Sequence, residues 1–228
     1  MKGIIDARSL PERAAVRRVV KKRTVASATA SAARLIGPLE RGVEITGLTN
    51  GQFGLIDILR HVLSEIGPAD VAISTWTMGI YDAQECAAFV SDGRIRRIRW
   101  VVDPSMFGRK PELVAPLLRA FGLDAFRPVN THAKFCTLVN ETWAVAVRSS
   151  MNLNPNRRLE SFDISEGPEL ARFFNAVVDD IFERMPAGER SQAEGRFASI
   201  LRAVDGEERS LASLLGERSN ILADALGG

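Results

Sequence analysis

Residues 132–160 read HAKFCTLVNETWAVAVRSSMNLNPNRRLE and constrain the fold more strongly than any other stretch of the chain. Residues 143–149 are rich in β-branched and aromatic side chains, which favours a strand. The apolar run that follows His132 predicts a second strand, and residues 140–142 are the natural turn between the two. The stretch therefore predicts a β-hairpin that continues into a polar loop.

The expected hairpin gathers four polar side chains at one end. Side chains alternate between the two faces of a strand, so His132 and Lys134 are expected to point the same way. A turn centred on residues 140–142 places Ser150 opposite His132, and Asn152 follows on the same side. An imidazole, an ammonium, a hydroxyl and an amide are therefore predicted to lie together.

This set of groups suits phosphodiester chemistry without a metal or another cofactor. A neutral imidazole is a nucleophile near pH 7 and can carry a proton afterwards. Lysine, serine and asparagine supply donors for phosphate oxygens that gain negative charge. The alternative is an ordinary hairpin that happens to carry a surface histidine, because the pattern His-x-Lys also occurs by accident.

The motifs of this hairpin resemble those of the phospholipase D superfamily. The family signature, HxKxxxxD followed by Gly-Ser-x-Asn, corresponds here to His132-Ala133-Lys134 and Ser149-Ser150-Met151-Asn152. The resemblance covers residues 50–185 and implies a phosphohistidine mechanism. It also implies that Glu160 is the acidic residue that orients the catalytic histidine.

The chain departs from the family pattern at two positions. Val139 stands where the family has an aspartate, and Ser149 stands where it has a glycine. Since that aspartate is mainly structural in the family, its loss is expected to be tolerable. A catalytically degenerate module that binds nucleic acid or a protein partner is the alternative that these departures support.

The rest of the central region predicts an α/β fold. Strands are expected at 43–49, 70–76, 95–102, 126–129 and 159–164, with helices at 53–66, 111–121 and 167–184 and another after residue 79. A strand, a helix and a strand joined by short links predict a parallel crossover unit. The family resemblance implies a mixed sheet with helices on both of its faces.

Further substrate-binding candidates follow from their positions. Ligands in α/β sheets lie beyond the carboxyl ends of strands, which selects Thr75 and Asp103, although Asp103 is equally well read as a helix or turn cap. Trp76 lies at the same end, and packing is its favoured role. Arg157 and Arg158, in the loop after Asn152, are candidates for contact with phosphate or nucleic-acid backbone, or are solvent-facing.

Both ends of the chain are expected to be helical. Residues 1–41 hold ten lysines and arginines against three acidic residues and predict a basic extension with a helix over 11–36. The sheet domain is expected over 42–185, and residues 186–228 predict a helical tail. The basic run RRVVKKR is either a nucleic-acid-binding arm or the solvated face of an ordinary helix, and the second is favoured.

The composition predicts a cytoplasmic protein without stable membrane association. No apolar run reaches the ~18–20 residues of a membrane span, and the N-terminus lacks a signal-peptide pattern. The two cysteines, Cys86 and Cys136, lie in apolar segments and are expected to be buried thiols. His61, the second histidine, is expected on the polar surface of its helix.

The family reaction needs two histidines, and this chain carries one motif. The simplest active form is therefore a twofold homodimer that brings two copies of His132 together. The predicted function is a metal-independent phosphodiesterase, a nuclease acting on DNA or RNA, with Lys134, Ser150 and Asn152 binding the phosphate. Phospholipid hydrolysis ranks lowest, since no amphipathic stretch with aromatic anchors is present.

Overall fold

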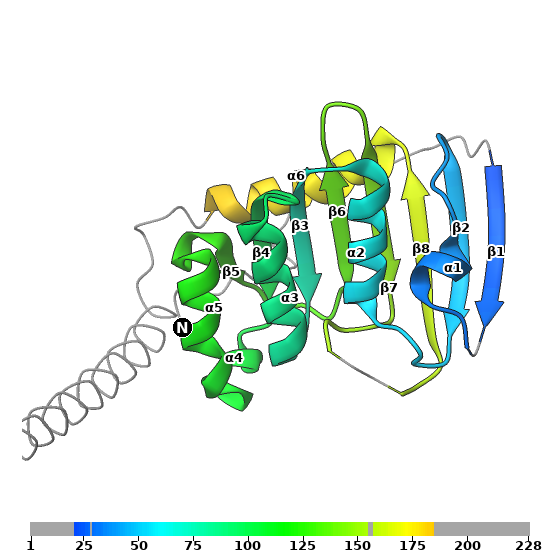
Figure 1. The fold of residues 1–228 in the computed structure, drawn as a ribbon. Coiled ribbons are helices and arrows are strands. Elements are labelled where there is room, and N and C mark those ends of the chain that lie inside the picture. The colour runs from blue at the N-terminus through cyan, green and yellow to red at the C-terminus, as the bar shows by residue number, and fades with distance from the viewer. Residues whose placement is uncertain (1–20, 28, 155–156, 185–228) are drawn as a thin grey trace, which may run out of the picture.

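The chain forms one eight-stranded mixed sheet with the strand order β1-β2-β8-β7-β6-β3-β4-β5. The structure is a computed structural model, which describes residues 21–27, 29–154 and 157–184. Helices cover both faces of the sheet (Figure 1). The expected α/β class and the mixed sheet are confirmed.

Each expected strand of the central region is present. The strands are β1 (Lys21–Ser27), β2 (Val43–Thr49), β3 (Ala69–Thr75), β4 (Ile95–Val102), β5 (Phe126–Pro128), β6 (Phe135–Val139), β7 (Ala144–Ser149) and β8 (Glu160–Glu166). The α-helices of the described residues are α1 (Ala32–Ile36), α2 (Leu55–Ile66), α3 (Ile80–Ser91), α4 (Ser105–Arg109), α5 (Val114–Phe121) and α6 (Pro168–Arg184). Short 3₁₀ turns, η2 (Pro111–Leu113) and η3 (Leu123–Ala125), flank α5.

The sheet joins two parallel sections through an antiparallel centre. Strands β3, β4 and β5 are parallel, as are β1 and β2, whereas β6, β7 and β8 each pair antiparallel with their neighbours. The unit β3-α3-β4 is the predicted parallel crossover. The hairpin β6-β7 is inserted between β3 and β8, so residues distant in sequence meet at the same sheet edges.

The main core lies between the sheet and the layer formed by α1, α2, α3 and α5. Its largest fully buried side chains include Trp100, Phe89 and Phe162. The ring of Phe162 lies directly over Gly47 of β2, where a Cβ atom would come within 2.2 Å of it. Only glycine therefore fits at this position.

Helix α6 covers the other face of the sheet and crosses behind it (Figure 1). Val178 and Ile181 are buried against residues of β3, β4 and β6, and Phe174, Val177 and Phe182 pack around them. Phe173 is half-buried and touches Phe174 edge to face. The predicted helix and its apolar stripe are therefore present, with Phe173 at the margin of the stripe.

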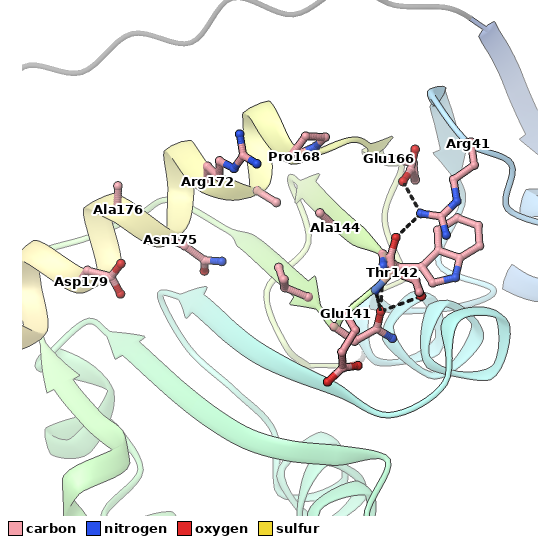
Figure 2. A pocket seen from close by; sticks show the side chains of 14 residues that line it. Arg41, Glu141, Thr142, Ala144, Glu166, Pro168, Arg172, Asn175, Ala176 and Asp179 are labelled. Carbon is pink, nitrogen blue, oxygen red and sulfur yellow. Dashed lines mark hydrogen bonds and ion pairs between the residues drawn. The ribbon is translucent and has the colours of Figure 1, made fainter.

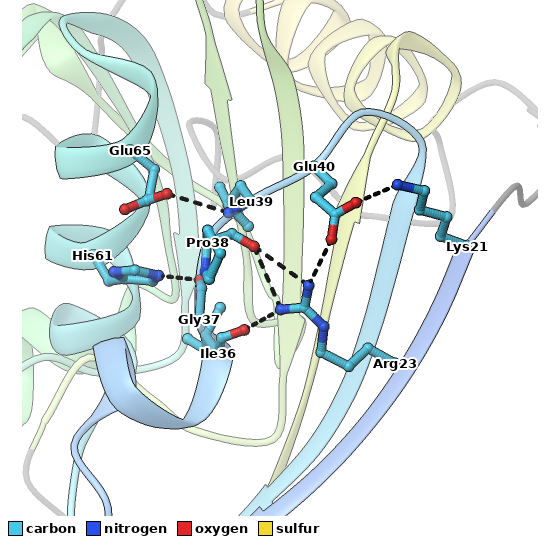
Figure 3. Close-up of polar contacts among 9 residues, drawn as sticks. All are labelled: Lys21, Arg23, Ile36, Gly37, Pro38, Leu39, Glu40, His61 and Glu65. Atoms are coloured by element: carbon cyan, nitrogen blue, oxygen red, sulfur yellow. Dashed lines mark hydrogen bonds and ion pairs between the residues drawn. The ribbon is translucent and has the colours of Figure 1, made fainter.

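The prediction of one helix over residues 11–36 is wrong for its second half. Residues 21–27 form strand β1, and the helix α1 begins only at Ala32. Side-chain exposure alternates along β1, with Val25 packed against the core. Arg23 donates to the carbonyls of Ile36 and Pro38 and pairs with Glu40, which holds the strand beside α1 (Figure 3).

The remaining parts of the predicted extensions, 1–20 and 186–228, lie outside the described residues. Among the described residues, no helix is long and apolar enough to cross a membrane. Both cysteines are free and buried, as expected.

His61 is buried rather than exposed, contrary to the sequence-based expectation. Its Nε2 lies 2.8 Å from the carbonyl oxygen of Gly37, and only 8% of the residue is accessible (Figure 3). The neighbouring Glu65 accepts a hydrogen bond from the backbone N–H of Leu39. The loop after α1 thus folds over this side of α2 and covers the histidine, which acts as a structural donor.

A buried carboxyl group on α3 gives the fold a pH-dependent weakness. Burial, together with the nearby charge of Asp57, raises the pKa of Asp82 to about 6. Glu85 also raises this pKa, whereas Arg60 and Lys110 lower it. Because the folded-state pKa exceeds the ordinary value of 3.8, the unfolded chain loses this proton first as pH rises. The free energy of unfolding therefore falls as the pH rises from about 4 to about 6.

We predict that Asp82→Asn stabilises the protein at pH 7.5 and has little effect below pH 4. The gain should be about 1–3 kcal/mol, or roughly 3–8 °C in Tm, because the neutral amide avoids the cost of a buried charge. Thermal unfolding followed by circular dichroism at several pH values measures it. The exposed Glu112→Gln is the matched control, and a lower Tm for Asp82→Asn at pH 7.5 would contradict the assignment.

Candidate functional site

Nearly all predicted site residues lie at one edge of the sheet, the lower edge in Figure 1. The carboxyl ends of β3, β4 and β7 meet there with the amino-terminal starts of β6 and β8. His132 and Lys134 directly precede β6, and Ser150 and Asn152 follow β7. The antiparallel pairing of β6 with β7 brings these two segments to the same edge.

His132 and Lys134 are in direct contact. The ammonium nitrogen of Lys134 lies 3.1 Å from His132 Nδ1 and 2.7 Å from the His132 carbonyl oxygen. An ammonium group only donates, so Nδ1 accepts, and the neutral imidazole carries its proton on Nε2. In this arrangement Nε2 is a donor and not a nucleophile.

Lys134 is buried beneath the exposed His132. Burial lowers the pKa of the Lys134 ammonium, and the negative charge of Glu160 opposes that effect. A cation held in this way is poorly solvated and has one nearby carboxylate as compensation. It is therefore suited to a second anion that approaches from the solvent side.

Glu160 connects the two halves of the site. Ser150 Oγ donates a hydrogen bond to Glu160 Oε2, and the same Oγ accepts from the Ser161 N–H at 2.9 Å. The Glu160 charge acts on Lys134 from this position. His132, Lys134, Glu160 and Ser150 thus form one continuous series of contacts and charge interactions.

The hairpin register differs by one residue from the predicted register. Asn140 N–H donates to the Trp143 carbonyl at 2.9 Å, so the turn spans four residues and not three. Ser149 N–H consequently donates to the Lys134 carbonyl at 3.0 Å. Ser150 therefore follows the residue paired with Lys134 and does not lie directly opposite His132.

The amide oxygen of Asn152 keeps its capacity to accept a hydrogen bond. Asn152 Oδ1 is buried and has no partner among the described residues. The flanking residues Met151 and Leu153 are buried and anchor this segment. No hydrogen bond within the described residues joins Asn152 to His132.

Thr75 and Asp103 position neighbouring segments. Thr75 is fully buried, donates to the Thr77 carbonyl at 2.7 Å and accepts from Leu153 N–H at 3.3 Å. Asp103 accepts from Ser105 N–H at 3.0 Å and from Thr131 N–H at 3.3 Å. Asp103 therefore caps the turn that leads into α4, which is one of the two roles that the sequence allowed, and it holds the residue before His132.

Arg157 and Arg158 are exposed on the loop that leads into β8. They make no hydrogen bond or ion pair within the part of the chain that the structure describes. Two exposed cations without an acidic partner among the described residues therefore lie just before Glu160.

Two residues beside His132 were not identified from the sequence as a functional pair. The Trp76 ring centroid lies 5.4 Å from that of His132, and the Arg109 guanidinium lies 3.9 Å from the centre of the Trp76 ring. Trp76 directly follows β3, and a position at the carboxyl end of a strand could have marked it as a ligand-binding residue, although the sequence favours a packing role for it. Arg109 carries no comparable signal, because only the tertiary structure brings α4 to this edge.

The two departures from the motif pattern are accommodated locally. Val139 ends β6 at the far edge of the sheet, and the adjacent Asn140 organises the turn. Asn140 Oδ1 accepts from Thr142 and Trp143, and Nδ2 donates to the Ile66 carbonyl at 2.9 Å. Ser149 Oγ donates to the Ser161 carbonyl at 3.1 Å. Polar contacts therefore support Ser149 itself and the turn that follows Val139.

A pocket of about 600 Å³ lies at the opposite edge, between the hairpin turn and α6 (Figure 2). Arg41 closes one side of it, with its guanidinium 3.1 Å from Glu166 Oε1 and 3.6 Å from the centre of the Trp143 ring. The residues that line this pocket include none of the candidates identified from the sequence. It is therefore separate from the His132 site.

The described residues contain no group of three or more histidine, cysteine or carboxylate side chains that could hold a metal ion. In comparisons with known proteins, no family model matches the chain and no curated protein sequence matches it.

We predict that the neutral imidazole of His132 is held as the Nε2–H tautomer in the unliganded protein. Lys134→Met removes the donor to Nδ1 and should produce a mixture of tautomers. Nitrogen-15 NMR of labelled histidine measures this directly, since the chain has only two histidines. His61 is the internal control, because its Nε2 faces a carbonyl oxygen and must keep its proton in both proteins. A protonated Nδ1 on His132 in the wild type would contradict the prediction.

Proposed function

We propose that the protein is a phosphodiesterase of phospholipase D-like fold that cleaves nucleic acid without a metal. The observation that carries the proposal is the contact between the buried Lys134 ammonium and Nδ1 of the exposed His132. A buried cation next to an exposed imidazole supports the binding of an anion at this edge of the sheet. The exposed Arg157 and Arg158 support a polyanionic substrate.

Phosphate binding would convert the resting site to the reactive one. A phosphate oxygen takes the Lys134 ammonium away from Nδ1, because a charged acceptor is preferred to a neutral one. Nδ1 can then hold the imidazole proton, which leaves the Nε2 lone pair free for attack. Glu160, already within the electrostatic range of Lys134, favours an imidazole that becomes positively charged.

The reaction requires a second proton carrier. Attack by Nε2 forms an N–P bond and breaks the P–O bond to the leaving group, which takes a proton as it departs. Water then breaks the N–P bond and restores the imidazole. Since His61 is buried against Gly37, we assign the second role to the partner subunit's His132 in a twofold dimer.

A binding module without turnover is the second candidate. The observation that favours it is that the polar groups of the site already bond to one another: Lys134 contacts His132, and Ser150 donates to Glu160. Such a site binds an anion only by exchanging these contacts. Phosphate-dependent binding without any covalent phosphohistidine would identify this function.

We expect the wild-type protein to cleave single-stranded DNA or RNA in the presence of EDTA. His132→Ala should lower the rate by roughly 10²–10⁴-fold or more, because it removes both nucleophile and proton carrier. Gel analysis of labelled oligonucleotides measures the rate. The matched control is His61→Gln, which should lower the Tm and leave kcat unchanged. Absence of cleavage by the wild type, or an equal rate in His132→Ala, would rule out the proposed activity.

Mixed dimers test the sharing of two histidines. If each reaction needs His132 from both subunits, activity follows the square of the wild-type fraction after exchange with His132→Ala subunits. An equal mixture should then keep about one quarter of the wild-type activity, and independent sites would keep about one half. The solution mass gives the oligomeric state. A linear dependence, or a strictly monomeric active enzyme, would contradict the shared site.

A further inference from the structure

An indole and a guanidinium form a stacked pair beside His132. Arg109 lies over the face of Trp76 at 3.9 Å, and the Trp76 ring in turn lies 5.4 Å from the imidazole. Trp76 is partly accessible and Arg109 is exposed. Arg109 makes no hydrogen bond or ion pair with any residue that the structure describes. The pair therefore carries an uncompensated positive charge at the edge of the site.

The loop that carries Trp76 is held on both sides. Lys110 Nζ donates to the Met78 carbonyl at 2.8 Å, which ties the loop to the end of α4. Met78 also forms a β-bridge with Leu153, and Gly79 N–H donates to the Leu153 carbonyl at 2.7 Å. These contacts link the Trp76 loop to the segment that contains Asn152 and anchor its backbone, while the indole ring itself is flanked by Arg109 and His132.

A fixed aromatic ring with a guanidinium is a surface for an unpaired nucleobase. Bases of single strands stack on aromatic side chains and on the plane of arginine, whereas bases in a duplex are already stacked on one another. Lipid headgroups and simple diesters lack such a planar group. A ring held beforehand loses little entropy when a base stacks on it.

We propose that Trp76 and Arg109 are the substrate-positioning residues of this site and that they select single-stranded nucleic acid. An unpaired base stacks on the Trp76–Arg109 pair while the adjacent phosphodiester lies at His132 and Lys134. This inference rests on the proposed function, because it assumes that a phosphodiester binds at this edge. Stacking adds affinity only for substrates that carry a base.

The test measures binding, so it does not require turnover. Fluorescence anisotropy compares a labelled single-stranded oligonucleotide with an abasic strand of equal length, using the full chain. The wild type should prefer the strand with bases. Trp76→Ala should weaken binding of that strand by about 5–150-fold and leave the abasic strand unchanged. Equal wild-type affinities for the two strands would overturn the inference.

Two milder variants keep the test decisive if Trp76→Ala does not fold. Trp76→Phe retains a smaller ring and should keep part of the preference for bases. Arg109→Lys retains the positive charge but loses the planar guanidinium. This variant should bind the abasic strand as the wild type does and lose part of the preference for the strand with bases. An unchanged preference in both variants would overturn the proposal, as would equal weakening of both strands.

A similar pair at the other edge of the sheet supplies the control. The Arg94 guanidinium lies 4.2 Å from the centre of the Phe89 ring, just before β4 begins. Arg94→Ala should leave the preference for bases unchanged. If the protein cleaves nothing but shows the Trp76-dependent preference, the catalytic proposal fails and the stacking site stands. If the protein cleaves simple diesters and shows no preference for strands with bases, the catalytic proposal stands and the stacking site is ruled out.

Discussion

The hairpin β6-β7 is inserted between β3 and β8, and this pairing positions every other part of the candidate site. Antiparallel pairing brings the start of β6 and the end of β7 to the edge where the parallel strands β3 and β4 end. That edge consequently collects His132 and Lys134 from one side and Ser150 from the other. The opposite edge holds the turn and a separate pocket formed with α6.

The electrostatics of the site follow from the burial of a single cation. Lys134 lies under an exposed imidazole, its pKa is lowered by burial, and Glu160 partly compensates its charge. The same ammonium holds His132 in the tautomer with the proton on Nε2. In the proposed function, an incoming anion that competes for Lys134 would change the partner of the ammonium and the tautomer of His132 together. This coupling makes phosphate binding and activation of the imidazole a single event in the proposed mechanism.

Several expectations failed for identifiable physical reasons. The sequence of the basic segment 21–27 does not by itself predict a strand. The segment forms one because the side of β2 that faces away from β8 has backbone groups that need a partner. His61 is polar and was placed on a helix surface, but the loop after α1 folds over it and offers a carbonyl partner. The hairpin register shifted by one residue because Asn140 closes a four-residue turn. In each case a contact with a distant or adjacent backbone group outweighed the local pattern.

The order of the strands and of the longer helices of the central region, the hairpin, and the proximity of His132 to Lys134 could all be predicted from the sequence, whereas the short helix α4 could not. These features depend on hydrophobic periodicity and short-range geometry, which are local properties of the chain. Three features became visible only once the chain was folded: the contact of Glu160 with Ser150, the burial of Thr75, and the position of Trp76 and Arg109 beside the imidazole. Apart from the bond between Ser150 and Glu160, these contacts join segments tens of residues apart, and their geometry depends on how the sheet and its helices pack rather than on any local pattern.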